Sequence, residues 1–158
     1  TILVRRRNDG SESRHLVTEL ELYRGEEDLA CHASKGKTPR TSVMYHEGGL
    51  VYVYLVYGMH WLLNVVTGPK SYPQAILIRG LHDVNGPGRI TKILDIKGDF
   101  YGEDLISSTR IWFEEGSAIP FKTGPRIGID YAGDYWKSVP WRYFVINSEA
   151  LTLPKKNS

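Results

Sequence analysis

The densest hydrophobic pattern in the chain lies between Leu50 and Thr67, where two apolar and aromatic runs are separated by a turn. Residues 51–56 alternate with β-branched and aromatic side chains, Gly58 supplies the turn, and residues 61–67 have the pattern of a return strand. The pattern therefore predicts a β-hairpin with Tyr57 at its tip. An aromatic ring at such an exposed place indicates a flat or apolar partner that receives it.

Short hydrophobic segments of the same kind recur along the chain, separated by 16 glycines and 8 prolines. This punctuation predicts a sheet protein with few helices. The further strands that we expect are residues 2–7, 16–23, 75–80, 111–114, 126–129 and 142–147. Short helices are expected at residues 28–34 and 90–94, with a loop at residues 36–40. The predicted fold class is α+β: a single domain, residues 1–158, with a curved, predominantly antiparallel β-sheet, a protruding β-hairpin and a few short helices.

Length and composition narrow the class of protein. A chain of 158 residues is one domain with room for a real core. Because Thr1 rather than methionine comes first, we expect that an N-terminal segment is missing. No apolar run is long enough to cross a membrane, and no signal peptide opens the chain, so no membrane association is expected. Cys31 is the only cysteine, which excludes a disulfide framework and zinc sites built from cysteine pairs.

The net charge of +2 argues neither for nor against nucleic acid, so the positions of the cations matter more. Each local cluster is either ordinary solvated surface or part of a phosphate-binding face. The clusters are Arg5 to Arg7, Lys35 with Lys37 and Arg40, Arg89 with Lys92, and Lys155 with Lys156. From these clusters we take Arg40, Arg89 and Lys92 as candidate contacts to a DNA backbone.

Two carboxylates lie on one face of the strand expected at residues 16–23. Strict alternation places Glu19, Glu21 and Tyr23 together, with Cα atoms of the two acids about 6.5 Å apart. A polar face that meets water is the simplest interpretation. A tyrosine on the same face and His32 in the following segment favour a second one, in which a carboxylate activates water against a glycosidic carbon.

Isolated polar residues interrupt two otherwise apolar strands. Asn64 stands alone in residues 61–66, and Arg79 is the one charge in residues 75–80. Each is either an ordinary buried group with a hydrogen-bond partner or a group that fixes orientation in an apolar pocket.

The aromatic side chains of the hairpin are open to two interpretations as well. Tyr52 and Tyr54 share a face and are either core residues or part of a pocket. Tyr57 is either core or a wedge between stacked bases.

Seven segments spread over nearly the whole chain resemble one family in the family's own order. They are ELELYRGEEDLACHA, KTPRTSVMY, VYVYLVYGMHWLLNVV, AILIRG, GPGRITKIL, RIGIDYAG and KSVPWRYFV. The family is that of the alkyladenine DNA glycosylases, also called 3-methyladenine or methylpurine DNA glycosylases.

The resemblance implies a role for each candidate residue. Glu21 matches the general base that activates the hydrolytic water, and Arg79 matches the arginine that holds this water and the phosphate of the extruded nucleotide. Tyr23, His32 and Tyr54 match residues that stack on the flipped base or hydrogen-bond to it, His32 through its backbone N–H. Asn64 matches the side chain that collides with the amino group of guanine. Tyr57 matches the wedge that fills the hole in the duplex.

The reaction implied is base flipping followed by hydrolysis of the N-glycosidic bond. The implied substrates are 3-methyladenine, 7-methylguanine, hypoxanthine and ethenoadenine in double-stranded DNA. No metal or other cofactor is expected. Because the expected pocket strands, residues 17–23, 50–66 and 75–79, contain no lysine, we expect water as the nucleophile and no lyase activity. A monomer in the bacterial cytoplasm, or in the nucleus if the source is eukaryotic, is the expected form.

The chain also departs from the family pattern, which predicts a helical segment before Ile2 and a longer connection than residues 81–85. Two other functions remain open. A non-catalytic single-strand binder would use Tyr52, Tyr54 and Tyr57 as stacking platforms. A carbohydrate hydrolase would use Glu19 with Glu21 as its carboxylate pair.

Overall fold

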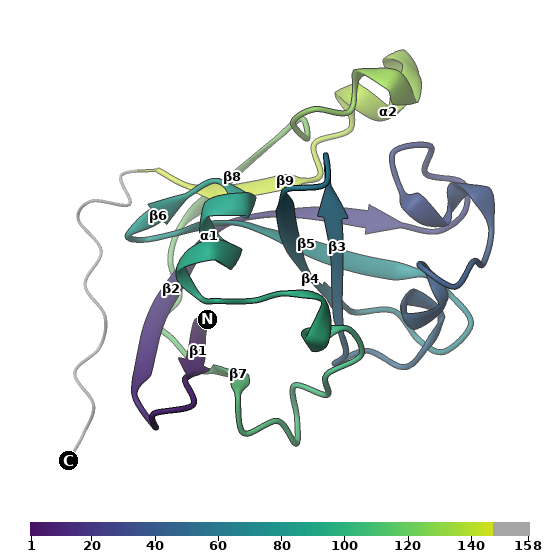
Figure 1. The fold of residues 1–158 in the computed structure, drawn as a ribbon. Coiled ribbons are helices and arrows are strands. Elements are labelled where there is room, and N and C mark those ends of the chain that lie inside the picture. Colours follow the sequence, from purple (N-terminus) through teal and green to yellow (C-terminus); the bar gives the residue numbers. More distant parts are fainter. Residues whose placement is uncertain (147–158) are drawn as a thin grey trace.

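The computed structural model describes residues 1–146, and within them one curled antiparallel sheet of nine strands dominates the fold (Figure 1). The hydrogen-bonded order is β3-β4-β5-β2-β1-β7, with β6 beside β5, β9 beside β2, and β8 beside β9. The strands are β1 (Ile2–Arg6), β2 (Glu12–Arg24), β3 (Val51–Val56), β4 (His60–Val66), β5 (Gln74–Leu81), β6 (Val84–Asn85), β7 (Ile111–Glu114), β8 (Phe121–Gly124) and β9 (Arg142–Val145). The predicted α+β class with a curved antiparallel sheet is confirmed.

Strand β2 joins the two halves of the sheet. Its first part pairs with β1 and its second part with β5 and β9. The register between β2 and β5 shifts on both sides of Glu19, and such irregularities bend a strand and increase its twist. Gly80 permits the close approach at this point, because a Cβ there would lie 2.8 Å from the Cβ of Glu19.

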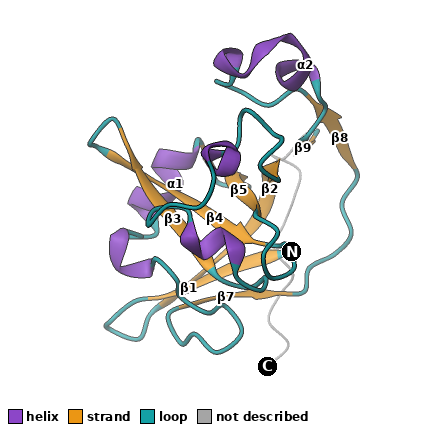
Figure 2. Ribbon diagram, turned by 90° about the vertical axis from the view of Figure 1, so that its right-hand side faces the viewer, coloured by secondary structure: helices purple, strands orange, loops and turns teal. Residues whose placement is uncertain are grey.

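The helices are short and connect or cover strands. They are α1 (Pro87–Ile93), α2 (Gly133–Ser138), and the 3-10 turns η1 (His32–Lys35), η2 (Ser42–Tyr45), η3 (Gly98–Phe100) and η4 (Asp130–Ala132). Helix α1 begins with Pro87, a residue suited to the first helical position because it has no N–H to leave unpaired. Figure 2 shows α2 at one end of the molecule, beyond β8 and β9 and away from β1 and β7.

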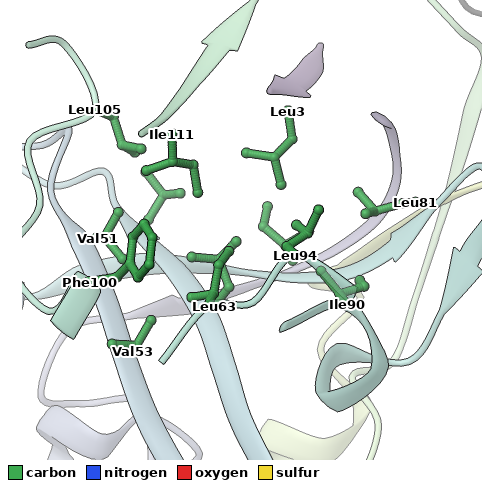
Figure 3. Close-up of a cluster of buried hydrophobic side chains, with 13 residues drawn as sticks. Leu3, Val51, Val53, Leu63, Leu81, Ile90, Leu94, Phe100, Leu105 and Ile111 are labelled. Atoms are coloured by element: carbon green, nitrogen blue, oxygen red, sulfur yellow. The ribbon is translucent and has the colours of Figure 1, made fainter. Parts of the chain in front are cut away.

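Alternation along the central strands divides the sheet into two faces. Val51 and Val53 of β3, with Leu63 of β4, point into the main core, where Ile90 and Leu94 of the α1 segment pack against them (Figure 3). The residues between them in sequence point to the opposite face. That second face carries the candidate site.

Most of the predicted elements are confirmed. The hairpin, the strands at residues 2–7, 16–23, 75–80 and 111–114, and the helix at residues 90–94 are all present with small shifts at their ends. The strand expected at residues 142–147 runs to Val145. Asn147, like the basic pair Lys155 and Lys156, lies outside the described residues.

Two predicted elements are wrong. Residues 28–34 do not form one helix. Turns lead into η1, which covers only the end of this range. The reason is that the Asp28 carboxylate accepts hydrogen bonds from Arg126 and from the backbone N–H of Ala30. Residues 126–129 are a loop rather than a strand, with Gly128 at φ 75°. The strand in this region lies earlier, at β8. In residues 1–146, no helix is long and apolar enough to cross a membrane.

Candidate active site

A pocket of about 230 Å³ opens on the second face of the sheet. Since a water molecule's share of liquid volume is about 30 Å³, the pocket has room for a ligand of several non-hydrogen atoms. Strands β2 to β5, the η1 segment and the loop before η4 build its wall. Its lining includes Tyr23, Cys31, His32, Met44, Tyr52, Tyr54, Tyr57, Leu62, Asn64, Leu77, Arg79, Ile127 and Tyr131. The candidate side chains from four separate strands are therefore brought together.

The carboxylate of Glu21 lies directly behind this wall and is fully buried. Tyr23 donates its O–H to Oε2 over 2.8 Å, and the backbone N–H of Ile127 donates to Oε1 over 2.7 Å. The Nε of Arg79 lies 3.5 Å from the same Oε1. All three of these partners line the pocket, so Glu21 lies directly behind residues of the pocket wall.

Burial raises the pKa of Glu21 above the ordinary range of a glutamate. The nearby charge of Arg79 and the hydrogen bonds from Ile127 and Tyr23 act in the opposite direction and favour the ionised form. Burial outweighs these effects, and a carboxyl with its pKa shifted by such specific partners is typical of functional sites.

Arg79 is held by the second carboxylate of β2. Its Nε donates to Oε1 of Glu19 over 3.2 Å, and Nη1 of Arg142 donates to the same oxygen over 3.2 Å. The Glu19 carboxylate therefore bridges two arginines. Since this carboxylate is already engaged, the structure does not support its use as the second acid of a sugar hydrolase.

Aromatic rings form one end of the pocket. The rings of His32 and Tyr54 meet edge to face with centroids 4.5 Å apart, and His32 Nδ1 lies 2.9 Å from the hydroxyl of Tyr52. Burial, followed by the charges of Arg40 and Lys35, lowers the pKa of His32 to about 4. The imidazole is consequently neutral at neutral pH.

The hairpin tyrosines differ in exposure. Tyr52 is buried in a hydrophobic cluster with Met44 and Val66, so it cannot serve as an exposed stacking platform. Tyr54 is half-buried and lines the pocket. Tyr57 is 87% exposed at the hairpin tip, as predicted. The binder that stacks bases on all three rings is therefore not supported.

The backbone at the tip is unusual. Tyr57 has a φ of 51° and Gly58 a φ of 66°, with the N–H of Met59 donating to the carbonyl of Val56. Positive φ at both central residues suits a tight hairpin turn, and Gly, Asn and Asp are the residues that normally adopt it. A tyrosine in that conformation is less stable than these residues, which points to a use for the ring.

Asn64 is buried at the pocket wall. Its Nδ2 donates to the carbonyl of Tyr52 over 3.1 Å. Within residues 1–146, its Oδ1 accepts no hydrogen bond, so the amide oxygen remains open to a ligand. The expectation that this residue faces a pocket agrees with its position.

The three basic residues considered for DNA contacts lie at the rim or beyond it. The guanidinium of Arg40 lies 5.0 Å from the centroid of the Tyr54 ring. Arg89 and Lys92 are exposed on α1, whose Gly88 lies against His60 at the base of the hairpin tip. Helix α1 thus lies beside the hairpin, and none of the three basic residues lines the pocket.

Sequence reasoning missed several residues of the site. Ile127 supplies the backbone donor to Glu21, and Tyr131 closes part of the wall. Arg126 and Asp28 form a fully buried ion pair beneath them. The RIGIDYAG segment carries Arg126, Ile127 and Tyr131, but its pattern resembles a strand and so conceals the loop. Among residues 1–146, no group of three or more acidic, histidine or cysteine side chains is placed to hold a metal ion.

Comparison with known proteins places this fold and site in one class. Residues 1–85 and 82–149 match the family described as methylpurine-DNA glycosylase. Three bacterial proteins named "Putative 3-methyladenine DNA glycosylase" are similar over most of their length. The one from Psychrobacter cryohalolentis is 43% identical over 177 residues, 94% of this chain and 82% of that protein. The one from Borreliella burgdorferi (strain ZS7) is 39% identical over 157 residues, which cover 90% of this chain and 84% of that protein. The one from Rickettsia felis is 40% identical over 147 residues, which cover 88% of this chain and 80% of that protein.

The protein is therefore a DNA glycosylase in class, and the chain belongs to the methylpurine-DNA glycosylase family. The two matched segments meet at residues 82–85, the short connection between β5 and α1. The Psychrobacter alignment, at 177 residues, is longer than the 158 residues of this chain, so the relative carries additional residues.

Proposed function

We propose that this protein excises damaged purines from duplex DNA by turning the nucleotide out of the helix and hydrolysing its N-glycosidic bond. The substrates are alkylated or deaminated purines, namely 3-methyladenine, 7-methylguanine, hypoxanthine and ethenoadenine. The observation that carries the proposal is the buried carboxylate of Glu21, which lies behind an aromatic pocket and is hydrogen-bonded to two residues of its wall.

Glu21 acts as the general base. An ionised carboxylate has about four acceptor sites, of which Tyr23 and Ile127 use two, so acceptor capacity remains for a water molecule. A positioned base that removes a proton from this water contributes about 10²–10⁴-fold to the rate. Arg79 is the cation beside Glu21 that orients the water and binds the phosphate of the extruded nucleotide.

The aromatic end of the pocket receives the base. Tyr23, Tyr54 and His32 offer ring faces and edges, and a purine alkylated at the 3- or 7-position is cationic, so electron-rich rings attract it. The neutral state of His32 avoids repulsion of such a base. Its backbone N–H makes no hydrogen bond within residues 1–146 and is available to an acceptor on the purine.

Opening the duplex is the task of the hairpin. The exposed ring of Tyr57 enters the stack at the emptied position, as aromatic and apolar wedges do in proteins that act in the minor groove. Arg40, Arg89 and Lys92 neutralise backbone phosphates on either side. Unstacking costs least for a damaged or mispaired base, which gives a first level of selection. The protein works as a monomer in this scheme.

The proposal is tested with duplex oligonucleotides that carry one hypoxanthine or ethenoadenine, treated with alkali after incubation to reveal abasic sites. Glu21→Gln should keep lesion binding and lose about 10²–10⁴-fold in single-turnover excision, because the amide cannot take a proton. Glu103→Gln is the matched control, since Glu103 pairs with Arg110 away from the pocket. Wild-type excision rates for Glu21→Gln would overturn the assignment of the base.

A further inference from the structure

The loop that donates a hydrogen bond to Glu21 has no regular structure of its own. Residues 125–129 connect β8 to η4, and no strand ladder includes them. Gly128 within this loop adopts a φ of 75°. Yet the N–H of Ile127 has to stay 2.7 Å from the carboxylate if it is to stabilise its charge. Another interaction must therefore fix the loop.

The buried ion pair of Asp28 and Arg126 supplies that interaction. Nη1 of Arg126 donates to Oδ2 of Asp28 over 2.6 Å, and Nη2 donates to Oδ1 over 2.9 Å. The two parallel bonds fix both the distance and the plane of the guanidinium. Nη1 also donates to the carbonyl of Leu22 over 2.9 Å. Leu22 lies between Glu21 and Tyr23, so the loop is joined to β2 beside the acid.

The same guanidinium contacts the second donor to Glu21. Its Cζ lies 4.7 Å from the centroid of the Tyr23 ring and 5.1 Å from that of Trp141. Tyr23 in turn donates its hydroxyl to Glu21. Arg126 thus positions both donors to Glu21. It holds the N–H of Ile127 because the two residues are adjacent in the chain, and it holds the hydroxyl of Tyr23 because the tyrosine ring packs on the guanidinium. Neither Arg126 nor Asp28 lines the pocket.

We infer that the Asp28–Arg126 pair is a positioning device that holds two hydrogen-bond donors against the Glu21 carboxylate and so maintains the ionised base. The inference rests on the proposed function, because it concerns the proton transfer at Glu21. Both donors favour the charged form of the acid. Loss of their alignment leaves a buried carboxyl with less to offset its desolvation, and a larger fraction of the enzyme is then protonated and inactive.

Arg126→Lys tests this inference. Lysine keeps the positive charge but has neither the planar face nor the paired donors of arginine. We expect the acid limb of single-turnover hypoxanthine excision to move by about one pH unit towards higher pH, since a hydrogen bond to a charged group is worth about that much. The rate should fall about tenfold below the limb and recover above it. Affinity for lesion DNA should change less than the excision rate, because Arg126 itself does not line the pocket.

Arg5→Lys is the matched control. Arg5 is also a buried arginine that donates to a backbone carbonyl, of Leu94, and lies 4.8 Å over a ring, that of Phe100. It is on β1, outside the pocket wall. This variant should lose thermal stability without a shift of the acid limb. A shift of the same size in Arg5→Lys would show a general effect of destabilisation and overturn the inference.

A lower Tm for Arg126→Lys with an unchanged acid limb would also overturn it and leave the pair a purely structural role. If Arg126→Lys does not fold, Asp28→Asn combined with Arg126→Met removes both charges, leaves no buried charge unpaired and keeps an acceptor for Ala30. The same alkaline shift is expected there, and a wild-type profile overturns the inference. Glu21→Gln distinguishes failure of the proposed function from failure of the positioning role. Wild-type excision in that variant defeats the proposed function itself. Its inactivity, combined with a normal profile for Arg126→Lys, defeats only the positioning role.

Discussion

Glu21 is fully buried, yet as the proposed general base it has to be ionised to accept a proton from water. Burial raises its pKa above the unfolded value of about 4.3. Between these two pKa values the folded state binds more protons than the unfolded state, so stability falls as the pH rises through this window. Ionisation of Glu21 therefore opposes folding, which in the proposed mechanism is the usual conflict between activity and stability.

Glu21→Gln should accordingly raise the Tm at neutral pH, because a neutral amide of the same shape replaces a buried charge while Arg79 keeps Glu19 as its partner. Each kcal/mol corresponds to about 2–4 °C in a domain of this size. The difference should vanish once the pH lies below both pKa values of Glu21. Thermal unfolding of wild type and variant across a pH series measures it.

Glu103→Gln should give the opposite sign. The hydrogen bond from Arg110, ahead of all other causes, lowers the pKa of Glu103. Its contribution to stability is present above the unfolded pKa and is lost as the pH falls through the folded one. The variant should therefore have a lower Tm at neutral pH and no difference in acid. A lower Tm for Glu21→Gln at neutral pH would contradict the account of Glu21 as a destabilising charge.

Asn64 is the residue at which substrate choice is decided in our proposal. Specificity against guanine requires an unfavourable contact with its exocyclic amino group, since the rest of the purine is shared with the substrates. Asn64→Ala and Asn64→Ser remove the side chain that makes this contact. We expect both variants to excise guanine from guanine–thymine mispairs. The fold-decrease in the rate of hypoxanthine excision should be smaller than the fold-increase in the rate of guanine excision. If folded variants leave guanine untouched, another group is the filter.

At the scale of the element, the β3–β4 hairpin presents Tyr57 in a left-handed conformation that a tyrosine adopts only at a cost in stability of order 1–3 kcal/mol. Tyr57→Ser removes the proposed wedge at the edge of the pocket and leaves Glu21 and its hydrogen-bond partners in place. Excision from duplex DNA should fall about tenfold or more, with a smaller loss on single strands, where no stack has to be filled. Parallel single-turnover assays on the two substrates check this.

Tyr135→Ser is the control for the loss of an exposed tyrosine, because Tyr135 is 71% exposed on α2 and does not line the pocket. Tyr135→Ser should leave the excision rates on duplex and single-stranded DNA unchanged. The Tm of Tyr57→Ser should stay at the wild-type value, since the ring it removes is exposed. Equal losses on duplex and single strands, together with a lower Tm, would show that Tyr57 supports the fold instead.

Local pattern predicted the strands that build the pocket but not the segments that close it. Period-two alternation identified the face shared by Glu21 and Tyr23, because each strand buries one face in the core and turns the other to the pocket. The helix expected at residues 28–34 forms turns and η1 instead, and the two acids before it contact distant residues. In the structure Glu26 accepts from Tyr45 and Glu27 from Tyr72, partners distant in sequence that no local pattern reveals.

Residues 126–129 are a second segment whose structure depends on a partner distant in sequence. Their apolar alternation is typical of a strand, but Arg126 is 98 residues from Asp28 in sequence and pairs with it in the interior. A fully buried ion pair stabilises a structure only if its geometry is satisfied on both sides. Here that requirement outweighs the local strand propensity and produces a loop, which carries the Ile127 donor to Glu21.

On the scale of the whole molecule, the curled sheet separates two tasks between its faces. The face covered by α1 holds the main hydrophobic core, and the opposite face holds the pocket. A rigid, packed sheet beneath a site keeps its groups in place during the reaction. The hairpin extends from the same strands that line the pocket, so the wedge and the base pocket are parts of one rigid unit.

The composition of the pocket wall leads to a prediction about the kind of product. Glycosylases that also cut the strand need an amine that forms a Schiff base with the sugar. No lysine lines the pocket among residues 1–146, and we therefore predict that water is the nucleophile. The protein should release the free base and leave an intact abasic strand, and its activity should persist in chelator. Borohydride added during turnover should trap no covalent protein–DNA adduct. If an adduct does form, Lys35, Lys37 and Lys92 should be replaced by arginine one at a time, and loss of trapping in one variant would identify the amine and refute hydrolysis by water alone.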